Sequence, residues 1–334
     1  MNIIIPMAGI GKRMRPHTLT VPKPLIPIAG KPIVQRLVED IAKVTDAQIE
    51  KIGFVVGDFG KEVENSLKEI AASVGAEGLI FYQQDALGTG HAIYCADEIL
   101  NGNVIVAFAD TLFKANFKLD REQDAIIWVQ KVEDPSAFGV VKLDKNNQIT
   151  DFIEKPKTPV SDLAIIGIYY FKNGEKLRDE LKRLIDNDLK DSGEYQLTRA
   201  LETMKENGIK FYPGQVIDWL DCGNKNATVD TNKRYLQYLE EQPLKGDNVK
   251  LINSIVIEPA YLGENVELRN SVIGPHVSIG KNSVIEDSII KNSIVQSNSN
   301  VKNMMMENSM IGNFVNLQGK KFDLSIGDYN SIIQ

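Results

Sequence analysis

Short apolar runs alternate with longer amphipathic segments over roughly the first 240 of the 334 residues. The apolar runs predict buried strands at 2–5, 52–56, 79–82 and 104–109. Between these runs the apolar residues recur at helical spacing, which predicts helices near 32–44, 60–74 and 89–99. This alternation predicts a Rossmann-like α/β domain, in which helices cover both faces of a mostly parallel sheet.

Further along, the apolar runs shorten and polar turns separate them. This pattern predicts strands at 138–143, 149–153 and 164–171, which make the sheet mixed. Helices are expected to return near 173–187, 194–207 and 224–240. For the helix near 194–207 we expect Asp191 or Ser192 to cap the first turn, with Glu194 completing a capping box.

After Pro243 an aliphatic residue returns about every six positions. The series is Val256, Leu262, Leu268, Ile273, Ile279 and Ile285. A hexapeptide period is typical of a left-handed parallel β-helix; a meander of antiparallel strands is the alternative, and it explains the spacing less well. We therefore expect two domains, residues 1–243 and residues 247–334.

The charges are distributed unevenly along the chain. The net charge of −7 argues against a general binder of nucleic acid or anionic membrane. The first 38 residues nevertheless hold six basic residues and no acidic one: Lys12, Arg13, Arg15, Lys23, Lys31 and Arg36. This segment carries +6 and the remainder −13, so we expect a local site for an anion near the N-terminus.

Two cysteines are too few for a disulfide framework, and no apolar run approaches the roughly 18 residues of a membrane span. We therefore expect a cytoplasmic protein that does not bind membranes.

The segment after the first strand contains the strongest chemical signal. It runs Ala8-Gly9-Ile10-Gly11-Lys12-Arg13-Met14-Arg15-Pro16 and is followed by Val21-Pro22-Lys23-Pro24-Leu25. Glycines after a strand let backbone N–H groups approach a phosphate, and nearby Lys and Arg neutralise its charge. The Walker spacing is absent, and Met14 stands where a dinucleotide fingerprint needs its third glycine.

These two elements together resemble the sugar-1-phosphate nucleotidylyltransferases, whose pattern is G-x-G-[TSK]-R-[LM]-x-P followed by P-K-P-L. The resemblance is to long forms of the glucose-1-phosphate thymidylyltransferase or uridylyltransferase type, which carry C-terminal hexapeptide repeats. It implies transfer of a nucleotidyl group from a nucleoside triphosphate to a sugar 1-phosphate. It also implies a nucleotide site made of Ala8, Gly9, Gly11, Lys12, Arg13, Gln83, Gly88 and Asp110.

Within that site the resemblance gives Arg13 and Lys23 the catalytic role of stabilising charge on the phosphates. Gln83 and Gly88 match the positions that read the base, and the pattern L-G-x-[GA]-H-A favours dTTP or UTP. The alternative for this segment is a simple helix N-terminus.

Asp110 and Asp221 match the metal ligands of the family, and paired carboxylates suit Mg²⁺. Asp218 is less favoured because it points to the opposite face of the same strand.

The sugar phosphate is expected over Gly139, Glu154, Lys155 and Ile165. Enzymes of the family that act on N-acetylhexosamine phosphates tend to have Asn two residues before the Gly of G-I-Y, where this chain has Ile165. Glucose 1-phosphate is therefore favoured.

The sequence is also compatible with other functions. One is a mannose-1-phosphate guanylyltransferase, because those enzymes share a similar R-P-x-T-L-T-x-P-K-P-L stretch. Another is a non-catalytic regulatory or scaffold relative, and a third is acetyl transfer by the repeat segment, where His276 is the obvious base. We expect the repeats instead to assemble a homo-oligomer.

Overall fold

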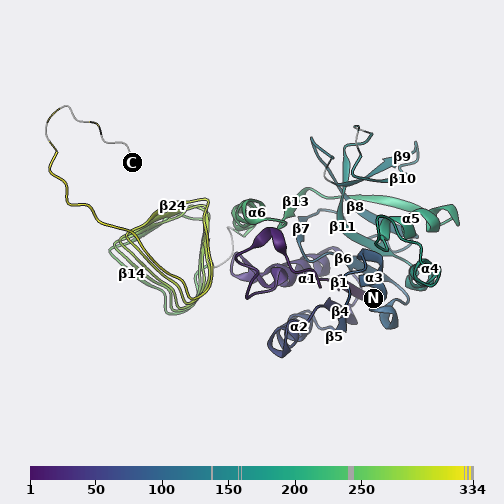
Figure 1. The fold of residues 1–334 in the computed structure, drawn as a ribbon, viewed down its shortest axis with the longest axis horizontal. Coiled ribbons are helices and arrows are strands. Elements are labelled where there is room, and N and C mark those ends of the chain that lie inside the picture. The colour runs from purple at the N-terminus through teal and green to yellow at the C-terminus, as the bar shows by residue number, and fades with distance from the viewer. Residues whose placement is uncertain are drawn as a thin grey trace. The chain divides into compact units, whose positions relative to one another are not determined.

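The structure is a computed structural model that describes residues 1–136, 138–156, 158, 160–239, 244–326, 328 and 331. The chain divides into two compact units (Figure 1). One contains Met1–Ile26 with Lys31–Ala227, and the other contains Pro27–Gly30 with Thr228–Gln334. The domain boundary predicted at residue 243 lies outside the described residues.

Parallel strands form the centre of the sheet in the first unit. β1 (Asn2–Pro6) is buried throughout and pairs with β4 (Lys51–Val56) on one side and β6 (Val104–Ala107) on the other. β5 (Glu77–Tyr82) pairs with β4. All four strands were predicted from their apolar runs. The carboxyl ends of β1 and β6 meet at one edge, because the two strands are parallel neighbours.

Antiparallel strands extend this sheet. β11 (Leu163–Phe171) runs antiparallel to β6 and to β8 (Ala125–Lys131). β9 (Gly139–Leu143) and β10 (Ile149–Glu154) form a hairpin beside β11, and β12 (Phe211–Gln215) pairs parallel with β8. The described residues thus form a nine-stranded mixed sheet, which confirms the predicted fold class.

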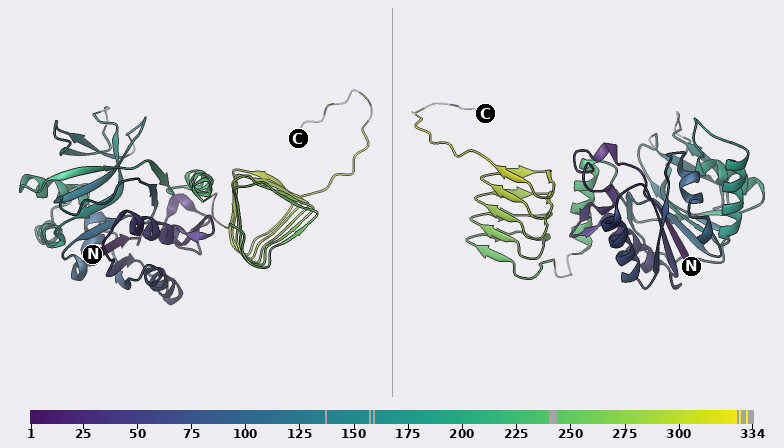
Figure 2. Two further views of the ribbon diagram at one scale, coloured as in Figure 1. Left: turned by 180° about the vertical axis from the view of Figure 1, so that it is seen from behind. Right: turned by 60° about the horizontal axis from the view of Figure 1, so that its bottom comes forward.

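Helices cover both faces of this sheet (Figure 2). Their bounds are α1 (Ile33–Val44), α2 (Lys61–Ser73), α3 (Thr89–Tyr94), α4 (Gly174–Asp186) and α5 (Leu197–Glu206). α1 and α2 contact each other, and α3 packs with α4 and α5. On α1, the apolar residues Val34, Leu37, Val38 and Ile41 are all completely buried, as their helical spacing predicts.

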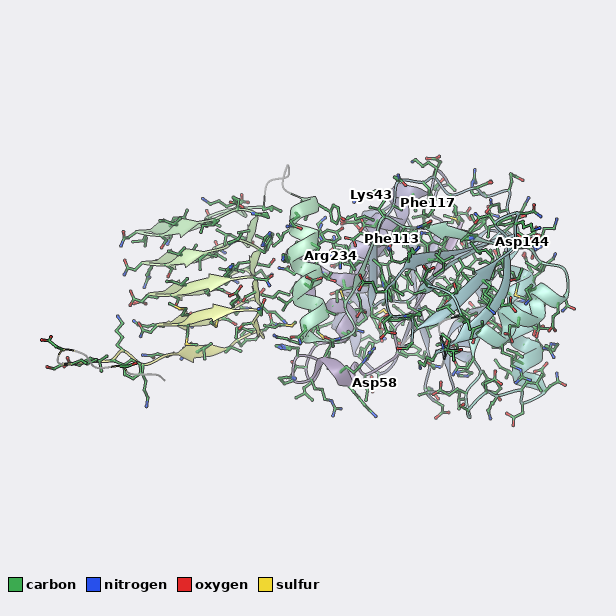
Figure 3. The ribbon with its side chains drawn as sticks, turned by 90° about the horizontal axis from the view of Figure 1, so that it is seen from above. Lys43, Asp58, Phe113, Phe117, Asp144 and Arg234 are labelled. Atoms are coloured by element: carbon green, nitrogen blue, oxygen red, sulfur yellow. The ribbon has the colours of Figure 1, made fainter. Side chains whose placement is uncertain are left out.

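Aromatic residues fill the core beside β8. Trp128 is completely buried, and its ring centroid lies 6.5 Å from that of Phe113 and 5.6 Å from that of Phe117. Both phenylalanines are labelled in Figure 3. Phe113 belongs to β7 (Thr111–Lys114), which pairs antiparallel with β13 (Asp218–Asp221). This packing holds the β7–β13 ribbon, which continues directly from the sheet edge at β6.

Two predicted helices differ from the observed ones. The helix expected at 89–99 ends at Tyr94 and is followed by a 3-10 turn at η3 (Asp97–Ile99). The expected capping box at Asp191, Ser192 and Glu194 is wrong, because the N-cap of α5 is Gln196 and its side chain makes no cap bond.

The residues of that expected cap form a tight turn instead. Asp191 and Glu194 exchange backbone hydrogen bonds of 2.8 and 3.1 Å. The first N–H of α5, that of Leu197, donates to Thr89 Oγ1 at 3.0 Å. A side chain distant in sequence therefore does the work that was predicted for a local cap.

The second unit consists of most of α6 (Lys225–Tyr238), a short loop and a parallel β-helix. The loop contains β2 (Pro27–Ile28), and β3 (Lys31–Pro32) follows it in the chain. The coils of the β-helix stack as a triangular prism (Figure 1). One sheet is formed by β14 (Lys250–Ile252), β17 (Glu267–Arg269), β20 (Val284–Glu286), β23 (Asn300–Lys302) and β26 (Asn316–Gln318).

The other two sheets of the prism have four strands each among the described residues. The second contains β15 (Ile255–Val256), β18 (Val272–Ile273), β21 (Ile289–Lys291) and β24 (Met305–Glu307). The third contains β16 (Ala260–Leu262), β19 (Val277–Ile279), β22 (Ser293–Val295) and β25 (Met310–Ile311).

The interior of the prism confirms the hexapeptide period. The core includes Leu262, Leu268, Ile273, Ile279 and Ile285, each at most 2% exposed. Asparagines occupy corners with left-handed backbone, and their side chains form ladders between coils. In one ladder Asn265 Nδ2 donates to Asn282 Oδ1 at 3.0 Å, and Asn282 Nδ2 donates to Asn298 Oδ1 at 3.2 Å. Asparagine suits this position because it tolerates a positive φ at low cost.

None of the helices described in the structure is long and apolar enough to cross a membrane.

Candidate active site

A tight glycine turn follows β1. Gly11 has φ +60°, and its carbonyl accepts hydrogen bonds from Met14 N–H at 2.9 Å and from Thr18 Oγ1 at 2.8 Å. Met14 lies in η1 (Lys12–Met14) and is completely buried, which anchors the turn. A Cβ on Gly11 would lie 3.1 Å from Lys23 Cβ. Glycine therefore serves both the left-handed backbone and the close approach of Lys23.

Lys23 begins the short turn η2 (Lys23–Leu25) directly after Pro22. Its side chain is only 10% exposed, and its Nζ lies 2.7 Å from Asp110 Oδ2. Asp110 follows the end of β6, which neighbours β1 in the sheet. The sheet thus brings together a cation and a carboxylate from two segments that are 87 positions apart in sequence.

Asp221 lies close to the same edge because of the β7–β13 ribbon. It pairs in register with Thr111, the residue after Asp110, and Cys222 N–H donates to the Asp110 carbonyl at 2.9 Å. Burial raises the pKa of the Asp221 carboxyl above its usual value, and the negative charge of Asp110 raises it further. The two carboxylates therefore interact, although 111 positions separate them in sequence.

These carboxylates fit the requirements of a hard divalent cation. Among the described residues, no group of three or more His, Cys, Asp or Glu side chains is placed to hold a metal ion. Mg²⁺ typically binds one or two carboxylates and completes its shell with water and substrate phosphates, so a pair suffices. A cation would also relieve the repulsion between Asp110 and Asp221.

A cleft of about 430 Å³ opens over the glycine turn. Every residue predicted for nucleotide binding or catalysis lines it: Ala8, Gly9, Gly11, Lys12, Arg13, Lys23, Gln83, Gly88 and Asp110. Gly223, which also lines the cleft, donates its N–H to Asp221 Oδ1 at 2.9 Å. A volume of this size is within the usual range for a small-molecule site.

The residues predicted for the sugar phosphate form a second group. Gly139 and Glu154 are partners in the β9–β10 hairpin. A Cβ on Gly139 would lie 3.0 Å from Glu154 Oε2 and 3.6 Å from Ile165 Cδ1, so these three residues are in contact. Lys155 Nζ lies 3.6 Å from Glu154 Oε1 and its side chain is mostly exposed. None of the four lines the cleft described above.

An aromatic pair links this second group to the cleft. Phe108 lines the cleft, and its ring meets the edge of the Tyr169 ring at a centroid distance of 6.2 Å. Burial raises the pKa of the Tyr169 phenol, and the nearby charge of Glu154 raises it further. Tyr169 therefore contacts Phe108 and is influenced by the charge of Glu154.

The sequence prediction missed several residues of the cleft. Thr89 and Glu194 both line it. The backbone of Tyr195 supports it, because Tyr195 N–H donates to Leu87 O and Gly90 N–H donates to Tyr195 O, each at 2.8 Å. Thr89 offered no signal beyond its position at a helix start. Glu194 was assigned to a capping box, and only the tertiary fold brings its turn against α3.

Comparisons with known proteins agree with this geometry. A family model described as nucleotidyl transferase matches residues 2–238. The chain is 31% identical over 338 residues to a glucose-1-phosphate thymidylyltransferase of Streptomyces antibioticus, which covers 93% of this chain and 92% of that protein.

The chain is also similar to a longer relative and to a solved structure. The chain is 33% identical over 271 residues to a bifunctional sugar-1-phosphate nucleotidylyltransferase/acetyltransferase of Sulfurisphaera tokodaii; the match covers 77% of this chain and 62% of that protein. A crystal structure of a UDP-glucose pyrophosphorylase complexed with UDP-glucose is similar with a TM-score of 0.58 at 26% identity. That match covers 71% of this chain and 98% of the other.

Proposed function

The chain belongs to the nucleotidyl transferase family, and on that premise we propose that it transfers a nucleotidyl group from a nucleoside triphosphate to a sugar 1-phosphate. The observation that carries the proposal is the convergence of the glycine turn, Lys23 and Asp110 on one cleft. The relative from Streptomyces antibioticus carries the name of an enzyme of this chemistry and aligns over nearly its whole length.

In the proposed reaction an oxygen of the sugar phosphate attacks the α-phosphorus of the triphosphate in line. The bond from the α-phosphorus to the bridging oxygen breaks, and pyrophosphate leaves with the bonding electron pair. The nucleophile needs no general base, because the second pKa of a phosphate monoester is about 6 and the group is mostly ionised at neutral pH. The task of the protein is to position charged groups and neutralise them.

The residues of the glycine turn have defined roles in this proposal. The backbone N–H groups at Gly9 and Gly11 approach the phosphates, where a side chain at Gly11 would collide with Lys23. Arg13 binds the leaving phosphates, and Lys23 neutralises charge beside the reacting ones. The ion pair with Asp110 holds the Lys23 ammonium at the wall of the cleft.

We assign Asp110 and Asp221 as the ligands of Mg²⁺, on the fit of the carboxylate pair described above. The ion, when bound, supplies positive charge to the phosphate oxygens and orients the triphosphate. Asp110 keeps 41% of its side-chain surface exposed although it pairs with Lys23, which leaves room for further ligands.

For the substrates we propose dTTP or UTP and glucose 1-phosphate. Gln83 and Gly88 line the cleft and are assigned to the base. Gly139, Glu154, Lys155 and Ile165 are assigned to the sugar phosphate, since Gly139, Glu154 and Ile165 lie in contact and the Phe108–Tyr169 pair connects them to the cleft.

Three further features belong to the proposal. We retain the division into a catalytic domain 1–243 and a β-helix domain 247–334, and we place the protein in the cytoplasm.

We also assign the β-helix to homo-oligomer formation. Ile255, Val272, Ile289 and Met305 are in register on one sheet of the prism, and Ile255, Ile289 and Met305 are 61%, 47% and 80% exposed. Such an apolar ladder is suited to contact with another subunit.

Pyrophosphate release tests this function directly. The full chain should be assayed with Mg²⁺ against a panel of nucleotides (dTTP, UTP, CTP, GTP and ATP) and of sugar phosphates (glucose, mannose and N-acetylglucosamine 1-phosphates). We expect the greatest release with dTTP or UTP and glucose 1-phosphate. Preference for GTP with mannose 1-phosphate would indicate a guanylyltransferase, and absence of release with every pair would indicate a non-catalytic relative.

A further inference from the structure

The side-chain amide of Gln83 is held at two points on the wall of the cleft. Its Nε2 lies 3.2 Å from the carbonyl oxygen of Gly88 and 3.2 Å from Nδ1 of His91. Gln83 and Gly88 line the cleft, whereas His91 does not belong to the lining and lies in α3 behind it. The proposed catalytic roles make no use of His91.

The chemistry of these contacts fixes which atom is donor and which is acceptor. A backbone carbonyl only accepts, so the group that faces Gly88 O is the NH₂ of Gln83. The second N–H of that NH₂ group points to His91 Nδ1, which must then accept. His91 is therefore neutral and carries its proton on Nε2.

The surroundings of His91 favour this state. Burial lowers the pKa of the imidazole below its usual value, and the opposing influence of the Asp85 carboxylate is weaker. Cys95 Sγ lies 4.0 Å from the same Nδ1, and burial raises the pKa of this thiol, so it presents no negative charge. The imidazole ring also lies beside the Tyr195 ring, with centroids 6.4 Å apart.

The loop that carries Gly88 packs closely against Tyr195. Gly88 has φ +110°, and a Cβ there would lie 2.6 Å from the Tyr195 carbonyl oxygen. In addition, Tyr195 N–H donates a hydrogen bond to Leu87 O, and Gly90 N–H donates one to Tyr195 O. The carbonyl that accepts from Gln83 is therefore held in place, and only the acceptor at His91 can be removed by a side-chain substitution.

We propose that His91 is a positioning residue for base recognition, because it orients the Gln83 amide so that Oε1 is the atom offered to a bound base. The inference rests on the proposed function. A fixed acceptor suits a base edge that carries a ring N–H, as uracil and thymine do at N3. Cytosine presents an acceptor at N3 and should bind less well, because this acceptor would face the Gln83 Oε1 acceptor.

The test is the ratio of kcat/KM for UTP to kcat/KM for CTP in variants of the full chain. His91→Leu removes the acceptor, while His91→Asn retains an oxygen close to the position of Nδ1. Cys95→Ala is the matched control, because it removes another neighbour of the same imidazole nitrogen. Comparing two nucleotides with the same triphosphate cancels effects on the phosphate site.

We expect His91→Leu to lower the ratio by about five- to tenfold, the worth of one hydrogen bond, mainly through the KM for UTP. His91→Asn and Cys95→Ala should stay within about twofold of the wild type, because each leaves an acceptor beside Gln83. If all three variants lose the same selectivity, or His91→Leu loses none, the inference is overturned.

A measurement on the unaltered protein covers the case in which His91→Leu fails to fold. Heteronuclear NMR of labelled histidine distinguishes protonated from unprotonated imidazole nitrogens, and the chain has only three histidines to assign. We expect His91 to carry its proton on Nε2 at pH 7.5. A proton on Nδ1 would overturn the inference. By contrast, a wild-type enzyme that uses no pyrimidine nucleotide would overturn the proposed base specificity itself.

Discussion

The ammonium group of Lys23 lies 2.7 Å from the carboxylate of Asp110, and both residues line the cleft. Lys23 comes from the loop after β1, and Asp110 from the end of β6, the neighbouring parallel strand. In the proposed reaction Lys23 is the cation that neutralises phosphate, and Asp110 is a carboxylate that binds the metal.

Replacing Lys23 by Met should lower kcat by about 100-fold or more, the usual effect of removing one donor to developing charge. The unfolding midpoint in urea should change little, because Asp110 remains partly exposed and can be hydrated. The control is Lys31→Met. Lys31 belongs to the same basic N-terminal segment as Lys23 but does not line the cleft. Its Nζ lies 2.7 Å from Glu39 Oε1. Similar losses in both variants would contradict the catalytic role of Lys23.

The metal ligands can be tested by titration with Mg²⁺. Chelation by EDTA should abolish turnover, and Asp221→Asn should raise the Mg²⁺ concentration for half-maximal rate by at least about tenfold. Asp218→Asn is the control on the same strand. Residues three positions apart in a strand point to opposite faces, so this variant should respond to Mg²⁺ as the wild type does. An equal shift for Asp218→Asn would argue against the assigned pair.

Gly139→Ala tests the assignment of the sugar site. The new methyl group would lie 3.0 Å from Glu154 Oε2 and displace that carboxylate. We expect the KM for glucose 1-phosphate to rise by about tenfold, as for a lost hydrogen bond, and the KM for the nucleotide to change by less than twofold. Steady-state kinetics with each substrate varied in turn separates the two. A rise confined to the nucleotide KM would remove Gly139 from the sugar site.

Prediction from the sequence succeeded where the signal is local and periodic. The central strands follow from their apolar runs, and Leu268 or Ile285 follows from the six-residue period. The motif around Gly11 and Lys23 could be identified because its residues are close in sequence.

Features that depend on long-range contacts were not accessible in the same way. Glu194 was expected to complete a capping box for α5, but its backbone pairs with Asp191 and the residue lines the cleft. The cap bond of α5 comes from Thr89, which is 108 positions away. His91 could be seen as part of a helix start, but its contact with Gln83 depends on how α3 packs at the edge of the sheet.

The asparagine ladder makes a separate prediction about stability. Asn282 has φ +58° and takes part in two ladder hydrogen bonds. Asn282→Ala should destabilise the β-helix by about 1–2 kcal/mol, and Asn282→Gly by less because glycine tolerates the backbone. Asn300→Ala is the control, because Asn300 is the first residue of strand β23 and is not among the residues with a positive φ. Hydrogen exchange of the coil amides reports the difference, and equal protection in Asn282→Ala and Asn300→Ala would count against the ladder.

Isotopic labelling distinguishes transfer of the α-phosphate with its nucleoside from transfer of the γ-phosphate. The full chain is incubated with Mg²⁺, glucose 1-phosphate and UTP or dTTP labelled either at the α- or at the γ-phosphate. The proposed reaction puts the α-label into a nucleotide sugar and the γ-label into pyrophosphate. Transfer of the γ-label to the sugar phosphate, or failure of either label to move, would contradict it.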